Sequence, residues 1–565
     1  MYSCVSILFD IFVLTLFHKL KKSFIISAIA FTTIGLFSFS SDDKYFQFTK
    51  NLDIFASLYS EVNKYYVDEV NPTELIKTGI DAMLEELDPY TVYIPEDDIE
   101  DYRTNATGEY GGIGIMSNKI RGKHLVLNLY EDSPAHTAGM KIGDEIIKID
   151  DRSIVEMSDE EAGKLLKGQS GSLVKIEVLR NGKTTESFDI ERKKITIPNI
   201  SYSTMLGENV GYFKMSEFTR SAGEDVEKTV IDLKTKGAES LIIDLRGNPG
   251  GLLNEAVAIC NLFVPKGSNI VQTKGKTQAQ SLSYSAKEPP LDLEIPLVVL
   301  IDHFSASASE IVSGVIQDYD RGVIVGRKSY GKGLVQVSRP LTFNSQLKVT
   351  TAKYYIPSGR CIQALDYLHR NPDGTAGTIP DSLKKEFYTS NNRKVYDGGG
   401  VDPDIQIDKK EQSSYTKNLR MSGLIFDYAT TYYYSHDEIA SAEEFKLSEI
   451  EYDEFVRWMD QKSFQNTSTV ESGLKMLKKA AESDKAYEQL SEEIDALSTA
   501  ITKTKSNGLI TFKDEIKSEL EKEIIKRYYL TAGLLQSTLN EDPFIDSALM
   551  VLSDQTHYES TLGSL

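Results

Sequence analysis

The chain is 565 residues long, which at about 150 residues per domain predicts three or four domains, each able to bury a core. Hydrophobic residues make up 40% and charged residues 26% of the sequence, as in ordinary soluble globular proteins. The net charge of −21 at pH 7 argues against a nucleic-acid partner, because phosphate binding depends on clustered Lys and Arg.

The three cysteines, Cys4, Cys260 and Cys361, have neither the spacing of a zinc site nor a CxxC motif. Cys4 lies in an apolar N-terminal region, so a processed protein holds at most one disulfide, between Cys260 and Cys361. Two ordinary thiols are an equal alternative. No motif indicates a metal or an organic cofactor, and we expect neither.

The N-terminus resembles an export signal. Lys19, Lys21 and Lys22 precede an apolar run over 24–39, and polar residues follow at 40–43. The run is shorter than the ~20 residues that span a bilayer comfortably. An earlier apolar stretch contains Asp10, so either translation starts after Met1 or the two stretches form a membrane anchor. The sequence therefore predicts export.

Helical patterns follow this segment. Apolar residues recur at helical spacing at Leu52, Phe55, Leu58, Tyr59 and Val62. A similar pattern over 76–87 ends at Asp88-Pro89. We expect residues 44–97 to form a helical region that packs within the protein or forms a homodimer.

Residues 98–193 have the pattern of a small β-rich module. The runs that favour strands are 124–130, 145–151 and 174–180. Asn181-Gly182 predicts a type I′ hairpin turn, which requires positive φ at both positions. Ser158 and Glu161 have the spacing of a capping box that opens a helix carrying Leu165 and Leu166.

Residues 194–408 alternate strand and helix patterns, which is typical of an α/β core. The predicted strands are 209–215, 241–245, 297–301 and 323–325, and the predicted helices are 224–236, 252–264 and the segment after Ser307. From 409 onward the chain is helical and acidic. Two apolar stripes there indicate helix packing, one beginning at Ile516 and one formed by Tyr487, Leu490, Ile494, Leu497 and Ile501.

The segment Ser305-Ala-Ser-Ala-Ser-Glu310 follows a buried strand and opens a helix. A serine at such a turn presents its hydroxyl to the positive end of the helix dipole. The alanines leave room for a substrate backbone. The alternative is that these serines cap the helix, which we expect for one of the three.

Gly331-Lys332-Gly333 follows the next predicted strand, and its glycines let the amine point into a tight site. A lysine in a surface turn is the alternative. Lysine acts as a base only when neutral, so burial must lower its pKa from about 10.4 towards about 7–8. Gln336 offers a neutral amide that can orient the amine, whereas a carboxylate there would stabilise the ammonium.

The third segment is the glycine-rich turn Asp244-Leu-Arg-Gly-Asn-Pro-Gly-Gly251. Its backbone amides could face a developing oxyanion. It has neither the GK[ST] nor the GxGxxG pattern of a phosphate loop. A plain tight turn is the alternative.

Together and in this order, the three segments resemble the carboxy-terminal processing (tail-specific) proteases over roughly residues 45–408. That family combines a D-L-R-x-N-P-G-G loop, an S-A-S-A-S-E nucleophile turn and a G-K-G-x-x-Q lysine segment. The resemblance implies Ser307 as nucleophile, Lys332 as base and Gln336 as the residue that orients the lysine. It implies two oxyanion donors, the amide of Ala308 and that of Gly250 or Gly251.

The same family carries a PDZ domain before its protease core. Gly111-Gly112-Ile113-Gly114-Ile115 resembles the carboxylate-binding loop, and the run 133–146 resembles the family's S-P-A-x-x-A-G-x-x-x-G-D-x-I pattern. A bound peptide would add a β-strand along the groove. Many relatives have arginine after the PDZ helix, where it is thought to couple peptide binding to activation. Lys167 stands there in this chain and keeps the charge but not bidentate pairing.

The implied fold is an α/β protease core with a crotonase- or ClpP-like βαβ arrangement, an inserted-type β-rich PDZ domain and helical terminal regions. The expected domains are a signal or anchor at 1–43, an N-terminal helical region at 44–97, a PDZ domain at 98–193, a serine protease core at 194–408 and a helical C-terminal domain at 409–565. The implied activity is that of a serine endopeptidase that binds apolar C-terminal tails and cleaves near them. The expected location is the periplasm or cell envelope, with an inner-membrane anchor as an alternative.

Three other functions are compatible with parts of the sequence. A serine–histidine hydrolase would use His303, but this residue lies at a strand end and is expected to be an ordinary turn histidine. A noncatalytic PDZ scaffold would not need Ser307, Lys332 and Gln336 together. A crotonase-like acyl-CoA enzyme would use the glycine amides but has no need of a PDZ domain or a lysine dyad.

Overall fold

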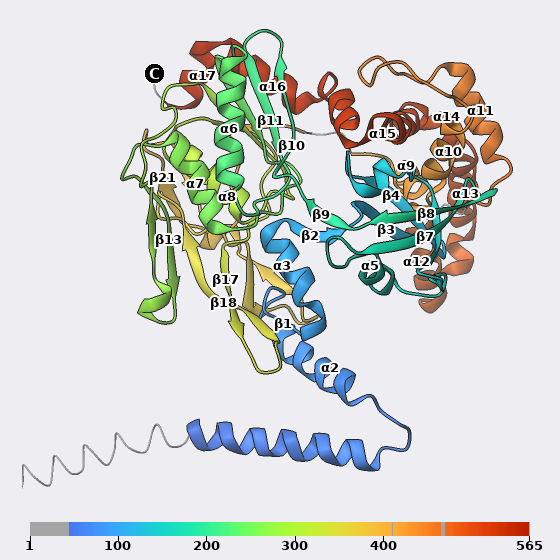
Figure 1. The fold of residues 1–565 in the computed structure, drawn as a ribbon, viewed down its shortest axis with the longest axis horizontal. Helices are drawn as coiled ribbons and strands as arrows, with labels where there is room; N and C mark the ends of the chain where they lie inside the picture. The colour runs from blue at the N-terminus through green and yellow to red at the C-terminus, as the bar shows by residue number, and fades with distance from the viewer. Residues whose placement is uncertain (1–43, 409–410, 465–468, 564–565) are drawn as a thin grey trace, which may run out of the picture. The chain divides into compact units, whose positions relative to one another are not determined.

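A six-stranded sheet, called the central sheet, forms the core of residues 200–406 (Figure 1). The computed structural model describes residues 44–408, 411–464 and 469–563. From β11 to β23 the neighbouring strands are parallel, and β10 is an antiparallel edge strand. The alternation of strands and helices predicted for this region is confirmed. The order of strands is β10 (Ile200–Leu206), β11 (Val210–Met215), β12 (Ser240–Asp244), β15 (Leu297–Ile301), β16 (Val323–Gly326) and β23 (Ile405–Gln406).

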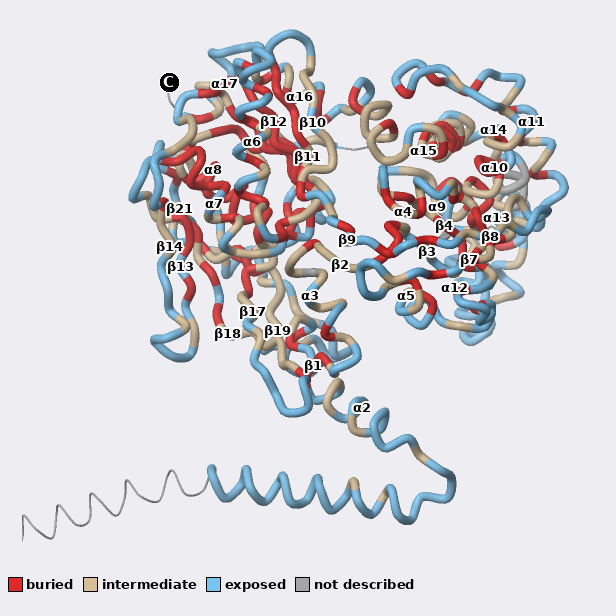
Figure 2. Tube along the Cα trace, viewed as in Figure 1, coloured by how far each residue is buried: buried red, intermediate tan, exposed pale blue. Residues whose placement is uncertain are grey.

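Helices cover both faces of this sheet. Successive strand residues point to opposite faces, so Val299 packs in one apolar core and Val298 in another. β12 (red in Figure 2) and β15 are buried along their whole length, as is usual for parallel strands covered on both sides. The first core contains α6 (Ala222–Thr235), α7 (Leu253–Phe263) and α8 (Ala308–Asp318), and the second contains α16 (Pro543–Ser553) and α17 (Gln555–Thr561).

A second sheet in the same region packs against α7 and α8. Its long strand β18 (Gln346–Tyr355) pairs antiparallel with β17 (Leu334–Pro340) and with β13 (Asn269–Gly275), which in turn pairs with β14 (Ser283–Ser285). Short hairpins complete the region: β19 (Leu365–Arg370) with β20 (Ala376–Thr378), and β21 (Glu386–Tyr388) with β22 (Lys394–Tyr396). Cys260 and Cys361 are free thiols, so of the two alternatives the disulfide is absent.

The predicted β-rich module is a separate sheet in the order β3-β4-β5-β7-β8. The hairpin turn at Asn181-Gly182 has φ of 50° and 63°, and Ser158 and Glu161 form the capping box of α5, so both local predictions are confirmed. A ribbon of β2 and β9 flanks the sheet. The elements are β2 (Glu109–Gly112), β3 (Ile115–Ile120), β4 (Lys123–Leu129), α4 (Pro134–Thr137), β5 (Glu145–Ile149), β6 (Arg152–Ser153), α5 (Asp159–Leu166), β7 (Leu173–Arg180), β8 (Thr184–Glu191) and β9 (Lys193–Thr196).

The C-terminal region is helical, as predicted. Its apolar core includes Ile516 and Leu520, which begin the second predicted stripe. The first stripe is only partly buried, because Ile494 is covered but Leu497 is 48% exposed. The helices are α9 (Ser414–Met421), α10 (Leu424–Tyr433), α11 (Glu449–Met459), α12 (Thr469–Ser483), α13 (Tyr487–Ser506), α14 (Gly508–Thr511) and α15 (Lys513–Leu539).

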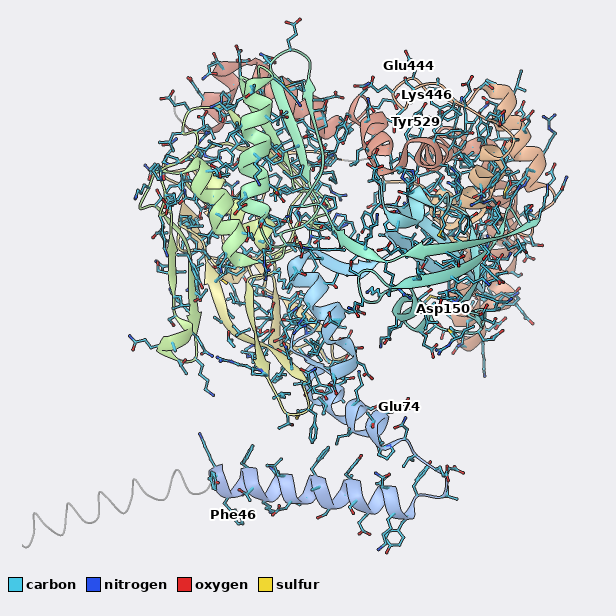
Figure 3. The ribbon with its side chains drawn as sticks, viewed as in Figure 1. Phe46, Glu74, Asp150, Glu444, Lys446 and Tyr529 are labelled. Carbon is cyan, nitrogen blue, oxygen red and sulfur yellow. The ribbon has the colours of Figure 1, made fainter. Side chains whose placement is uncertain are left out.

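Residues 44–93 form a unit of their own. It holds a helix over 44–65 and α2 (Pro72–Glu85), and Asp88 then accepts hydrogen bonds from the amides of Tyr90 and Thr91 in a turn. The first helix exposes apolar side chains, among them Phe46 (Figure 3). The expected signal or anchor at 1–43 lies outside the described residues. In the described part, no helix is long and apolar enough to span a membrane.

Candidate active site

Three loops meet at the carboxyl-terminal ends of the strands of the central sheet. They follow β12, β15 and β16, which are neighbouring parallel strands, so their carboxyl ends lie together. A cleft of about 530 Å³ opens there. The structure thus brings together candidates that the sequence separates, and the cleft is lined by Gly250, Gly251, Ser307, Lys332 and Gln336 among others.

Ser307 has an uncommon backbone conformation. Its φ of 55° and ψ of −111° are rare for a residue with a side chain, and it precedes the first turn of α8. Strain of this kind persists where the surroundings impose it, and it raises a side chain out of a strand-to-helix turn. Ser305 donates to the carbonyl of Leu245 and Ser309 to that of Asn248. Of these three serines, only Ser307 lines the cleft.

Gly250 lies against the serine turn more closely than any side chain would allow. A Cβ atom there would lie 2.5 Å from the carbonyl oxygen of Ala306 and 2.7 Å from the amide nitrogen of Ala308, and its φ is 92°. The Gly250 amide donates to Oδ1 of Asn248 at 2.9 Å. No described residue accepts a hydrogen bond from the amide of Gly251 or of Ala308. The Gly250 amide is therefore already engaged within the loop, whereas the Gly251 amide has no acceptor among the described residues.

A buried carboxylate connects the serine turn to the lysine segment. Oε2 of Glu310 accepts from the amide of Ser307 at 2.8 Å and from that of Lys332 at 2.9 Å, and Oε1 accepts from the Gly331 amide and the Ser329 hydroxyl. Burial raises the pKa of Glu310, although these hydrogen bonds act in the opposite direction. Since all four groups donate, the arrangement suits an ionised carboxylate.

Tyr354 makes the same connection from the second sheet. Its hydroxyl lies 3.1 Å from the carbonyl oxygen of Ser307 and 2.7 Å from that of Lys332. Sequence reasoning missed this residue, and it missed the role of Glu310. Glu310 stands in the quoted motif, but its partners Lys332 and Gly331 come from another loop, so the motif alone could not reveal them.

Lys332 lies in the loop just before β17, and Gln336 lies within β17. Gly331 has a φ of 89°, and a Cβ there would lie 2.4 Å from Cβ of Ala364, so this turn requires glycine. The Gln336 amide nitrogen donates to Oγ1 of Thr350 at 3.1 Å. His303 is exposed beside Phe304 and does not line the cleft, which disfavours a serine–histidine pair.

Two charged residues of the cleft had no signal in the sequence. Lys348 comes from β18, and burial lowers its pKa. Glu217 follows β11, and burial raises its pKa. Neither residue belongs to a motif. Their places in the cleft depend on how segments distant in the sequence pack together.

A second hollow, of about 210 Å³, lies between β3 and α5. Ile113, Gly114 and Ile115 line it, whereas Gly111 and Gly112 pair with β9 instead. β3 is an edge strand of its sheet and can accept an added strand. The hollow therefore lies beside a strand edge that is open for pairing.

Lys167, which also lines this hollow, points its amine towards the neighbouring helix. Nζ donates to Oδ1 of Asp101 at 2.6 Å and lies over the ring of Tyr110. Asp101 is in α3 (Ile99–Thr107), and the next residue, Tyr102, lines the large cleft and forms a hydrogen bond with Ser338. Contacts through Lys167, Asp101 and Tyr102 thus connect this hollow to the cleft.

Comparison with known proteins gives three family matches. Residues 209–381 match peptidase family S41, residues 111–191 match a PDZ domain, and residues 415–552 match the C-terminal helical domain of probable PDZ-proteases. The chain is 35% identical over 322 residues to a carboxy-terminal-processing protease of Bartonella bacilliformis, covering 56% of this chain and 73% of the relative.

Two further relatives have similar names. The carboxy-terminal processing protease CtpA of Bacillus subtilis is 27% identical, over 69% of this chain and 80% of the relative. A probable CtpA-like serine protease of Staphylococcus aureus is 30% identical, over 67% of this chain and 75% of the relative. The chain therefore belongs to the carboxy-terminal processing proteases, serine proteases of family S41 that carry a PDZ domain.

Proposed function

We propose that this chain is an exported serine endopeptidase that cleaves proteins near their C-termini with a Ser307–Lys332 dyad. The observation that carries the proposal is that Ser307 and Lys332 line the same cleft. Glu310 and Tyr354 each form hydrogen bonds with the backbone of both residues. A peptide-binding scaffold would have no use for this connection. The crotonase- or ClpP-like description of the core is part of the same proposal.

The chemistry begins with a neutral Lys332. Its amine removes the proton of the Ser307 hydroxyl as Oγ attacks the peptide carbonyl. Gln336 orients the amine: its nitrogen is held by Thr350, and its oxygen can accept from Nζ. The amides of Ala308 and Gly251 donate to the oxyanion, while Gly250 lets the loop approach the serine.

The intermediate then breaks down. The C–N bond breaks as Lys332 returns the proton to the leaving amine, which gives an acyl-enzyme on Ser307. A water molecule attacks the acyl carbon, its proton passes to Lys332, and the ester bond to Oγ breaks with return of a proton to the serine. The products are a carboxylic acid and an amine, and the enzyme is regenerated without a metal or organic cofactor.

The PDZ domain recruits the substrate. A free, apolar C-terminus adds a strand to the edge of β3, and the backbone around Gly114 binds its carboxylate. The ion pair of Lys167 with Asp101 supports a role for Lys167 in coupling this groove to the cleft through α3. Export follows from the pattern at 19–43. A membrane anchor and a homodimer have no support among the described residues and are not part of the proposal.

We also propose the domain division 1–43, 44–97, 98–193, 194–408 and 409–565. In this division α16 and α17, although they come from the last segment, cover one face of the protease sheet.

The test is cleavage of an unfolded reporter with an apolar C-terminal tail. Wild type is expected to release a short C-terminal fragment, identified by mass spectrometry, and Ser307→Ala is expected to release none. Amidation of the tail is expected to slow wild type, because it removes the carboxylate that the PDZ groove binds. Equal cleavage by Ser307→Ala would refute the proposed nucleophile, and tail binding without cleavage would favour the scaffold.

A further inference from the structure

Arg246 lies at the base of the glycine-rich loop and forms ion pairs with two carboxylates. Its Nε and Nη2 donate to the two oxygens of Asp244 at 2.9 and 2.7 Å. Its Nη1 donates to Oδ2 of Asp542 at 2.7 Å, and the guanidinium lies 4.8 Å from the centre of the Phe544 ring. Three of the five N–H donors of this guanidinium are thus engaged by carboxylates.

The second carboxylate comes from a distant part of the chain. Asp542 caps α16 by accepting from the Phe544 amide through Oδ1, which leaves Oδ2 for Arg246. Phe544 is 3% exposed and belongs to the core formed by α16, α17 and the central sheet. Neither residue lies within 209–381, the part that matches the peptidase family. The C-terminal segment therefore reaches the loop of the active site.

Both ends of the Arg246 residue are fixed as well. Its amide donates to Asp244 Oδ1, and its carbonyl accepts from Nζ of Lys214 at 2.8 Å. The following amide, that of Gly247, donates to Oδ1 of Asp302 at 3.0 Å. The loop that begins at Arg246 is thus anchored to the sheet edge before it turns towards the cleft.

From there the contacts continue to the serine turn. The Asn248 carbonyl accepts from the amide of Ala306 and from the hydroxyl of Ser309. Oδ1 of Asn248 holds the Gly250 amide. A displacement of Arg246 would therefore shift the loop that presents the Gly251 amide relative to Ser307.

We propose that Asp542 and Phe544 are positioning residues of the proteolytic reaction, which hold the Arg246 guanidinium and through it the oxyanion loop 247–251. The proposal rests on the proposed function, since it assumes that the loop donates to the oxyanion. It assigns to the C-terminal segment an indirect part in catalysis, through the position of this loop. Rate follows the geometry of such donors closely, because a misplacement of about 1 Å can cost about 10²-fold.

The test variant is Asp542→Asn. Asparagine is as good a helix cap as aspartate, so the substitution removes the charge from Arg246 and retains the start of α16. Asp554→Asn is the matched control, because Asp554 caps α17 in the same layer, accepting from the His557 amide, and is exposed. Asp542→Glu restores the charge, and Phe544→Leu removes the ring while retaining an apolar side chain.

The measurements are kcat and KM for a short peptide with both ends blocked, which does not need the PDZ groove, and the melting temperature of each variant. Asp542→Asn is expected to lower kcat by at least about 10-fold, because the rate is sensitive to the position of the oxyanion donors. KM is expected to stay within about 2-fold of the wild-type value. Its melting temperature is expected to equal that of Asp554→Asn. Phe544→Leu is expected to lower kcat in the same way, and Asp542→Glu to recover part of it.

Two outcomes would overturn the proposal: a wild-type kcat in Asp542→Asn, or a loss of kcat that merely follows a lower melting temperature. Failure of the proposed function gives a different result, in which Ser307→Ala still cleaves. Cleavage that depends on Ser307 but not on Asp542 would leave the proposed function intact and refute only this inference.

Discussion

The backbone amides of Ser307 and Lys332 donate to the same carboxylate oxygen, Oε2 of Glu310, at 2.8 and 2.9 Å. The proposed nucleophile and base come from different loops, so one buried acid sets the distance between their backbones. The structure thereby explains why a glutamate follows the serines at the start of α8.

Replacement of Glu310 by Gln tests this role. The glutamine has one acceptor oxygen, and its NH2 group would face amides that also donate, so the two loops would separate. We expect kcat to fall by about 10²-fold, as for other misplaced catalytic groups. The control is Glu224→Gln, which alters an exposed acid in the first turn of α6 and should leave kcat unchanged. A wild-type kcat in Glu310→Gln would contradict the assigned role.

The acid stability of the fold should depend on Asp244. Burial alone would raise the pKa of this carboxyl, but Arg246 and Lys214 outweigh it and lower the pKa to about 2. A lowered pKa contributes stability above the unfolded-state value of about 3.9, and this contribution is lost as the pH falls towards about 2. The contribution at neutral pH is about 2–3 kcal/mol, at 1.36 kcal/mol for each unit between the two pKa values.

The measurement is the free energy of unfolding of wild type and Asp244→Asn between pH 7 and pH 2. The variant should be less stable by at least about 2 kcal/mol at neutral pH, and the difference should shrink below pH 4. Asp232→Asn, which removes a half-exposed acid paired with Lys236, should show no such trend. A difference that stays constant with pH would show that Asp244 is not ionised in the folded protein.

These examples also show which features the sequence could predict. The Asn181-Gly182 turn and the Ser158 capping box are local, so neighbouring residues suffice to specify them. The pairing of Arg246 with Asp542 depends on how distant elements pack, and no local pattern reveals it. An amphipathic pattern likewise predicts that a helix buries one face but not which surface it covers, so the packing of α16 and α17 on the protease sheet was not foreseen.

The candidate site divides in the same way. Ser307, Lys332, Gln336 and the glycine loop belong to contiguous motifs, and the structure places them around one cleft. The sequence predicts the five-residue PDZ segment less accurately. Only Ile113, Gly114 and Ile115 line the hollow, whereas Gly111 and Gly112 pair with β9. Lys348 lacks a motif and could be found only from the pairing of β17 with β18.

Recognition of tails should depend on the backbone at Gly114. Its φ is 78°, and a Cβ there would lie 2.3 Å from Cβ of Ser133, so Gly114→Ala should distort the loop at the groove. We expect KM for a tailed reporter to rise by about 10-fold, with little change for the blocked short peptide. Gly122→Ala is the control, because Gly122 has a φ of 80° but open space around it. Equal effects of the two variants would argue against a binding role for this loop.

Lys348 should favour acidic substrates. It lines the cleft, and burial lowers its pKa, so a carboxylate on the substrate would restore part of the lost solvation. Lys348→Met should lower kcat/KM for peptides with an acidic side chain by about 10-fold relative to their neutral counterparts. The exposed Lys353 of the same strand provides the control, Lys353→Met. No change in the ratio of acidic to neutral substrates would exclude this role.

The most direct test of the dyad is the rate of reporter cleavage by Lys332→Ala beside Ser307→Ala and His303→Ala. Loss of the general base or of the nucleophile should each lower the rate by at least about 10³-fold. His303→Ala should cleave at the wild-type rate, because His303 lies outside the cleft. Cleavage by Lys332→Ala at the wild-type rate would contradict the proposed mechanism, and so would a loss of cleavage in His303→Ala.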